Sequence, residues 1–182
     1  MSDVAAAFEG DGVRPRGSRT HVERPIKYQL NVIGSTVLDV VTSAGGWLFD
    51  RVMAGWEVNV LVAELDEVRP LEILGARSFE LNSALRAMRK GPHPQALAVA
   101  IDVFDRDERV RQAVLAAMLR GSTEVTFWGP GTPARVERTV SPVEHPLTAA
   151  AQVFKAHALV AAAAGESSGP TETFFSGGSS FR

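Results

Sequence analysis

The chain has 182 residues, of which 45% are apolar and 22% charged, and its formal net charge at pH 7 is −2. This composition suits one globular domain and lacks the basic excess typical of nonspecific nucleic-acid binders. The absence of cysteine excludes disulfides, thiolate nucleophiles and zinc-finger sites. With no apolar run long enough to span a membrane and no secretory signal pattern, we expect a cytoplasmic protein.

Residues 1–24 form an N-terminal segment that is rich in Gly, Pro and charge. This composition predicts a disordered tail, because it offers too little apolar surface to drive folding. An alternative role is a basic arm that contacts nucleic acid or an acidic partner, a role suggested by Arg14, Arg16, Arg19 and Arg24.

Residues 166–182 are rich in Gly and Ser, which predicts a flexible C-terminal tail. In an alternative interpretation this segment docks into a groove through its aromatic side chains, Phe174, Phe175 and Phe181. The remaining residues, 25–165, are assigned to a single domain.

The first strand and helix of this domain have clear signals. Apolar residues alternate over residues 26–32, which predicts a strand. Thr36 and Asp39 have the spacing of a capping box, and helical periodicity continues from there to about Gly55. The pair at 45–46 is Gly-Gly, which we expect to loosen or kink this helix.

The next segments continue the alternation of strand and helix. Residues 58–65 are almost continuously apolar, which indicates a strand covered on both faces. Residues 71–74 suggest a short strand or a turn. Ser78 is expected to cap a helix that ends at about Gly91.

Residues 96–104 predict a second buried strand, and Asp102 lies within it. Asp105 is expected to cap the following helix, which ends at Gly121. A strand at 123–128 follows, and 135–140 is interpreted as its antiparallel return. An Ala-rich helix runs from Pro146 to Gly165.

This alternation predicts a three-layer α/β fold with a largely parallel open sheet and an antiparallel hairpin at one edge. The pattern resembles Rossmann-like folds over residues 26–165. Such a resemblance implies no function by itself.

Ligands of open α/β sheets bind beyond the carboxyl ends of the strands. Gly34, Ser35 and Thr36 follow the first strand and meet a helix N-terminus, which would favour an anion such as phosphate. An ordinary helix cap is the alternative. The sequence lacks the Gly-rich motifs of P-loop and dinucleotide-binding proteins. The ligand-binding candidates are Gly34, Ser35, Thr36, Asp102, Asp105 and Thr132.

Four carboxylates near the strand ends could hold Mg²⁺, which prefers oxygen ligands. They are Glu64, Asp66, Asp105 and Asp107. Each also has an ordinary explanation as a helix cap or a solvated charge. Asp102 is the most informative carboxylate, because an acid within an apolar strand either faces a cleft or has a buried partner.

Large apolar side chains on the first helix suggest a contact surface. If this helix is apolar on two sides, one side would face a second subunit, and we expect a homo-oligomer. The interface candidates are Trp47, Phe49 and Met53.

The sequence does not decide whether the protein is an enzyme, and it identifies no catalytic residue. The favoured hypothesis is a non-catalytic α/β module that binds a small ligand or a protein partner in a regulatory or accessory role. The alternative is a Mg²⁺-dependent enzyme acting on a nucleotide or phosphoester. A third hypothesis, nucleic-acid contact through the N-terminal arm, is favoured least.

Overall fold

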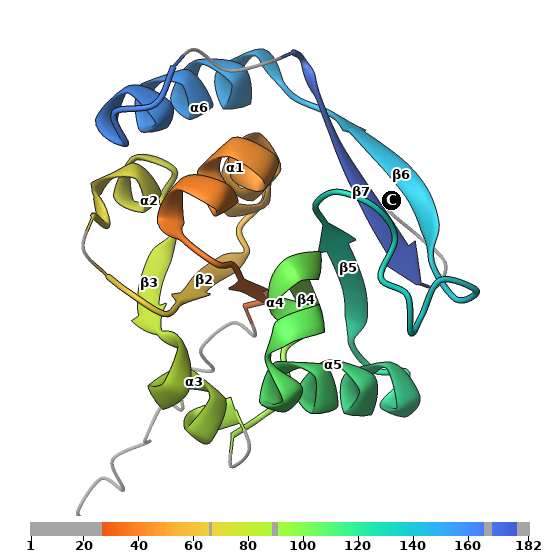
Figure 1. Ribbon diagram of the computed structural model, residues 1–182. Coiled ribbons are helices and arrows are strands. Elements are labelled where there is room, and N and C mark those ends of the chain that lie inside the picture. Colours follow the sequence, from red (N-terminus) through yellow and green to blue (C-terminus); the bar gives the residue numbers. More distant parts are fainter. Residues whose placement is uncertain (1–26, 66, 89–90, 166–168, 178–182) are drawn as a thin grey trace, which may run out of the picture.

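A computed structural model describes residues 27–65, 67–88, 91–165 and 169–177 (Figure 1). Its seven strands form one sheet in the order β3-β2-β1-β4-β5-β7-β6. The strands are β1 Gln29–Ile33, β2 Glu57–Val62, β3 Arg77–Glu80, β4 Ala96–Ala100, β5 Glu124–Trp128, β6 Ser141–Pro146 and β7 Thr171–Gly177.

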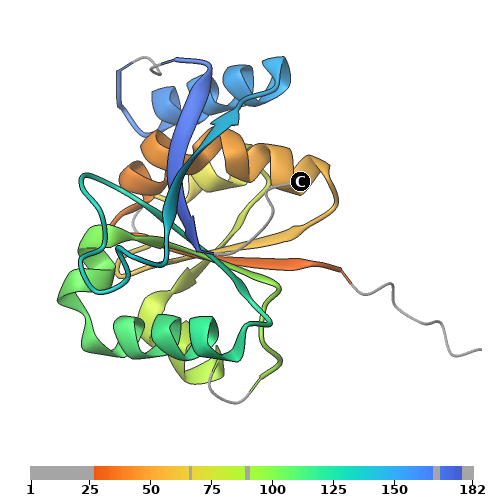
Figure 2. The same ribbon diagram turned by 90° about the vertical axis from the view of Figure 1, so that its right-hand side faces the viewer.

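Six helices cover the two faces of this sheet. They are α1 Val37–Met53, α2 Arg69–Ile73, α3 Leu81–Met88, α4 Ile101–Arg106, α5 Glu108–Arg120 and α6 Ala149–Ala161. Figure 2 shows α1 and α6 on one side of the sheet and α3 and α5 on the other. One apolar core lies on each side of the sheet.

The predicted α/β class with a largely parallel sheet is confirmed. Strands β1 to β5 pair in parallel, whereas β7 is antiparallel to both β5 and β6. The antiparallel part therefore exists, but its strands differ from the predicted ones. Residues 135–140 form turns, and the returning strand beside β5 is β7. Among the described residues, no helix has the length and apolarity needed to cross a membrane.

Several element boundaries around residues 100–108 differ from the sequence predictions. Strand β4 ends at Ala100, so Asp102 lies in the first turn of α4 instead of within a strand. The cap of α5 is Asp107, which accepts hydrogen bonds from Arg109 N and Val110 N, and Asp105 belongs to α4.

Element boundaries around residues 70–80 differ from the sequence predictions as well. The predicted short strand at 71–74 is largely helix α2, where Pro70 occupies a position at which a helix needs no N–H donor. Ser78 lies in strand β3 and does not cap a helix. The side chain of Glu80 instead accepts hydrogen bonds from Asn82 N and Ser83 N at the start of α3.

The segment predicted to be a flexible C-terminal tail contains a strand of the sheet. Residues 171–177 form β7, which lies between β5 and β6. Along this strand exposed and buried residues alternate, and Phe174 is fully buried. The Gly and Ser content on both sides hides this short alternation in the sequence. Of the three aromatic residues of the tail, Phe181 lies outside the described residues, as do the arginines of the N-terminal segment.

The expected subunit interface on α1 is wrong for two of its three residues. Helix α1 is apolar on two sides because it lies between the sheet and α6, as Figure 1 shows. Trp47 and Phe49 are buried, and the ring of Phe49 stacks on that of Phe154 in α6. Only Met53 is exposed. The second apolar side is thus covered by the same chain, and oligomerisation stays a prediction.

A buried ion pair joins α1, α6 and β7. Lys155 Nζ lies 2.6 Å from Glu172 Oε1, and both side chains are almost fully buried. The same carboxylate accepts hydrogen bonds from the backbone N–H groups of Gly46 (2.9 Å) and Trp47 (2.8 Å). A Cβ atom at residue 46 would collide with the side chain of Leu147. Gly46 therefore allows Leu147, which lies just before α6, to pack closely against α1.

Replacing Glu172 with Ala should lower the free energy of unfolding by about 3–5 kcal/mol, because Lys155 would stay buried without its counter-ion. Urea denaturation monitored by tryptophan fluorescence measures this loss. The control is Glu144→Ala on the neighbouring strand, where the side chain is exposed and a change within about 0.5 kcal/mol is expected. A Glu172→Ala loss of less than about 1 kcal/mol would contradict this role of the ion pair.

The position of β7 predicts how truncations behave. A chain that ends at residue 168 lacks the strand between β5 and β6, so we expect it to lose cooperative unfolding. A chain that ends at residue 177 keeps β7 and should unfold at nearly the temperature of the full chain. Circular dichroism during heating compares the two, and a cooperative transition of the shorter chain near that temperature would show that β7 is dispensable.

Candidate functional site

Four side chains meet at the carboxyl ends of strands β1, β4 and β5. Ser35 Oγ lies 3.2 Å from Asp39 Oδ2 and 3.4 Å from Asp102 Oδ1. The indole Nε1 of Trp128 donates to Asp39 Oδ2 at 3.3 Å. Two carboxylates thus share one serine hydroxyl, and we refer to Ser35, Asp39 and Asp102 as the Asp–Ser–Asp cluster.

The sheet topology explains why these residues meet. The strand order reverses between β1 and β4, the two strands that Ser35 and Asp102 follow. At such a switch point the chain leaves the sheet in opposite directions, which opens a crevice where ligands of α/β proteins bind. The cluster therefore lies at the place where this fold class commonly holds its ligand.

Local geometry fixes each member of the cluster. The turn after β1 requires glycine at position 34, because a Cβ atom there would collide with the side chain of Val40. Thr36 then caps α1 by accepting a hydrogen bond from Asp39 N, which places the Asp39 carboxylate in the first helical turn. Asp102 occupies the equivalent turn of α4, and Trp128 is the last residue of β5.

The two carboxylates differ in their surroundings. Burial raises the pKa of Asp39 above its ordinary value, and the nearby charge of Asp102 raises it further, while hydrogen bonds from Trp128 and Ser35 oppose the shift. The side chain of Asp102 is 36% exposed. Its Oδ2 atom lies 3.9 Å from Nη1 of the exposed Arg106, and the two side chains form a weak surface ion pair.

The hydroxyl of Ser35 cannot serve both carboxylates as a donor at once. A hydroxyl has one hydrogen, so Ser35 can donate to only one of its two carboxylate neighbours at a time. The other contact is a good hydrogen bond only when that carboxyl group is itself protonated. A raised pKa at Asp39 makes this protonated state easier to reach.

A pocket of about 370 Å³ adjoins the cluster. It is bounded by Ser35, the first turn of α1 and the loop after β2, from which Glu64 and Glu67 contribute. Both glutamates are exposed. The pocket is open enough to admit a small molecule, and the ionisable side chains that line it are acidic.

The structure brings together some predicted ligand-binding residues and not others. Gly34, Ser35, Thr36 and Asp102 lie at one site. Asp105 and Thr132 are exposed and form no part of the cluster. Two further members of the site, Asp39 and Trp128, were not among the predicted site residues. The Thr-x-x-Asp signal did find Asp39, but it indicated only a helix cap.

The predicted Mg²⁺ ligands do not form a recognisable metal centre. Glu64 lies at the adjoining pocket, Asp107 is engaged as the cap of α5, and Asp66 lies outside the described residues. Within the described part of the chain, no group of three or more His, Cys, Asp or Glu side chains is placed to hold a metal ion. The described members of the predicted set, Glu64, Asp105 and Asp107, are therefore not gathered into one metal site.

Neither the family models nor the curated proteins include a match to this chain. Solved structures do match. A triple mutant of a deacetylase in the teicoplanin biosynthetic pathway (Orf2*T) superposes with a TM-score of 0.58 at 12% identity, covering 85% of this chain and 99% of that one. The A40926 pseudoaglycone deacetylase Dbv21 gives a TM-score of 0.54 at 15% identity, covering 82% and 96%.

A third solved structure carries a different activity. The 4-carboxy-2-hydroxymuconate hydratase GalB from Pseudomonas putida KT2440 has a TM-score of 0.53 at 15% identity, covering 74% of this chain and 78% of that chain. The shared property is an α/β fold. At these identities the likeness extends to the fold alone.

These matches correct the favoured sequence hypothesis. A non-catalytic ligand-binding or protein-interaction module was expected, mainly because no known catalytic motif is visible. The three solved structures named above, two deacetylases and a hydratase, are enzymes that share the fold over most of this chain. The expectation of a non-catalytic module is therefore withdrawn. It relied on contiguous motifs, which cannot reveal a cluster such as Asp–Ser–Asp, whose residues lie up to 67 positions apart in the sequence.

The raised pKa of Asp39 predicts a specific pH dependence of stability. The folded state keeps the carboxyl proton of Asp39 to a higher pH than the unfolded chain does. The contribution of Asp39 to the free energy of unfolding therefore falls as pH rises from about 3.9, the unfolded pKa, through the folded pKa. Asp39→Asn removes this cost and can still accept the Trp128 hydrogen bond. Relative to the native chain, the variant should gain thermal stability between pH 3 and pH 8.

Thermal unfolding across this pH range measures the difference between the two proteins. Exposed Glu72 provides a control, because Glu72→Gln should give a nearly constant difference. If the Asp39→Asn difference is equally independent of pH, Asp39 does not titrate abnormally in the folded state.

Proposed function

We propose that this protein is a hydrolase that uses water to remove an acyl group from a small amide, with the Asp–Ser–Asp cluster as its acid–base centre. The observation that carries the proposal is the position of Ser35 Oγ, 3.2 Å from one carboxylate and 3.4 Å from the other. Two carboxyl groups in different surroundings, one buried and one partly exposed, can provide an acid and a base in one site.

The proposed reaction assigns one role to each carboxyl group. Asp102, the more accessible carboxylate, takes a proton from a water molecule as the water oxygen attacks the carbonyl carbon. Asp39, whose pKa is raised by burial, acts in its protonated form and gives its proton to the leaving nitrogen as the C–N bond breaks. The products are a carboxylic acid and an amine.

Ser35 completes the cycle in this proposal. After the reaction Asp102 carries a proton and Asp39 has lost one. The hydroxyl of Ser35 can accept from Asp102 while it donates to Asp39, so one concerted shift restores the starting state. Ser35 is therefore a proton relay and not the nucleophile.

The surroundings of the cluster support a class of substrate. The adjoining pocket of about 370 Å³ suits a small molecule, and Glu64 and Glu67 would repel an anion. A neutral or cationic amide fits this charge, and the amine product gains a proton beside acidic side chains. The deacetylase activity of two proteins with the same fold supports the reaction type. The cysteine-free composition supports a cytoplasmic location.

The test is release of amine from a panel of small N-acetyl compounds, including 4-nitroacetanilide and N-acetylated amino sugars. We expect Asp39→Asn and Asp102→Asn to lower kcat by about 10²–10⁴-fold, the usual effect of losing general acid–base catalysis. Ser35→Ala should also lower kcat, because the proton would return through solvent. Glu72→Gln is the control for loss of an exposed carboxylate and should keep native activity.

Parallel assays separate this proposal from other chemistry. Each is run with and without EDTA and with a phosphomonoester panel. EDTA-insensitive amide cleavage that both Asp variants lose supports the proposal. Native activity in both variants overturns the assignment of the site, and cleavage of phosphomonoesters alone overturns the proposed reaction.

A further inference from the structure

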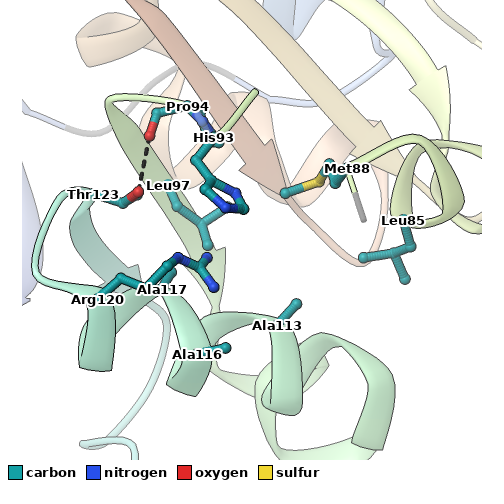
Figure 3. Close-up of a pocket in the computed structure, with 10 residues that line it drawn as sticks. All are labelled: Leu85, Met88, His93, Pro94, Leu97, Ala113, Ala116, Ala117, Arg120 and Thr123. Atoms are coloured by element: carbon teal, nitrogen blue, oxygen red, sulfur yellow. Dashed lines mark hydrogen bonds between the residues drawn. The ribbon is translucent and has the colours of Figure 1, made fainter. Parts of the chain in front are cut away.

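A second pocket lies at the opposite end of the sheet from the Asp–Ser–Asp cluster. It has a volume of about 260 Å³ and is lined by α3, by α5 and by the segments that lead into β4 and β5 (Figure 3). Pro94 and Thr123 precede β4 and β5, whereas the cluster follows the carboxyl ends of β1 and β4. The two sites therefore do not share residues.

The floor and walls of this groove are apolar. Leu97 and Ala117 are buried at its floor, and Leu85 and Met88 form the wall contributed by α3. Thr123 is the polar residue of the floor, and its hydroxyl donates to the carbonyl of Pro94 at 2.9 Å. Since that hydrogen bond is already made, the interior is suited to an apolar group and not to a polar one.

Two nitrogen-bearing side chains stand at the mouth of the groove. Figure 3 shows the guanidinium of Arg120 and the imidazole of His93 on the side of the pocket nearest Pro94. Both residues are exposed. No acidic residue lines the pocket, and Arg120 forms no ion pair within the described part of the chain. The groove therefore combines an apolar interior with an unneutralised cation at its rim.

We propose that this groove binds a small amphipathic carboxylate. Its hydrocarbon part would lie between α3 and α5, and its carboxylate would pair with the guanidinium fork of Arg120, with His93 as a further donor. Ligand pockets usually measure about 300–1,000 Å³, so this groove admits only a small molecule. This site is separate from the proposed hydrolase centre and does not depend on it.

The experiment is an NMR titration of the full-length ¹⁵N-labelled protein with sodium octanoate. Octanol and octylammonium serve as probes with the same chain and a neutral or positive head. We expect octanoate to shift the amide signals of Ala113, Ala116 and Ala117 and to bind more tightly than either analogue. Arg120→Gln should weaken octanoate binding about fivefold, because the ion pair is exposed to solvent.

Two further variants complete the test. Ala116→Trp fills the groove and should abolish binding of all three probes. Arg138→Gln removes an exposed arginine that does not line the pocket, and it should leave octanoate affinity unchanged. Since Arg120→Gln alters only a surface charge, the proposal can be tested even if Ala116→Trp fails to fold.

The outcomes are distinct from those of the activity assays. Octanoate-selective shifts at α5 that weaken in Arg120→Gln but not in Arg138→Gln support the proposal. It is overturned if octanoate causes no shifts at α5 at millimolar concentration. It is also overturned if octanol binds as well as octanoate, or if the Arg120 and Arg138 variants behave alike.

Discussion

The buried pairing of Lys155 with Glu172 is the interaction on which the arrangement of this fold depends. It joins three elements that are distant in the sequence, namely α1, α6 and β7, through one carboxylate that also accepts two backbone N–H groups. Removing two charges from water is costly, so the pair itself adds little to the free energy of folding. Any arrangement that separates the buried charges is strongly disfavoured, however, because each charge would then lack its counter-ion. It thereby fixes how α6 and β7 pack on α1.

Helix α1 connects the ion pair to the candidate site. The Glu172 carboxylate holds the middle of the helix, and Asp39 lies in its first turn. A helix held in this way places Asp39 against Trp128 and Ser35. Of the residues proposed to perform chemistry, Asp39 therefore lies on the same helix that Glu172 holds, and this favours the fixed geometry that an acid–base pair requires.

The site also places two chemically identical side chains in different surroundings. Asp39 and Asp102 both lie in the first turn of a helix that follows a parallel strand. Asp39 is more buried, which raises its pKa, while Asp102 is more open to solvent. The distinction arises from tertiary packing, since both residues lie in the first turn of a helix at the end of a parallel strand and differ in how deeply the rest of the fold buries them.

The sequence by itself determined the fold class, the strands β1, β2 and β5, and the cap of α1, because period-two and helical apolar patterns are local signals. It also placed Gly34, Ser35, Thr36 and Asp102 near strand ends. Only the tertiary structure decided that residues 171–177 belong to the sheet, that α6 covers the second apolar side of α1, and that Asp39 and Asp102 share Ser35. These features depend on contacts between residues far apart in the chain, and no local periodicity encodes such contacts.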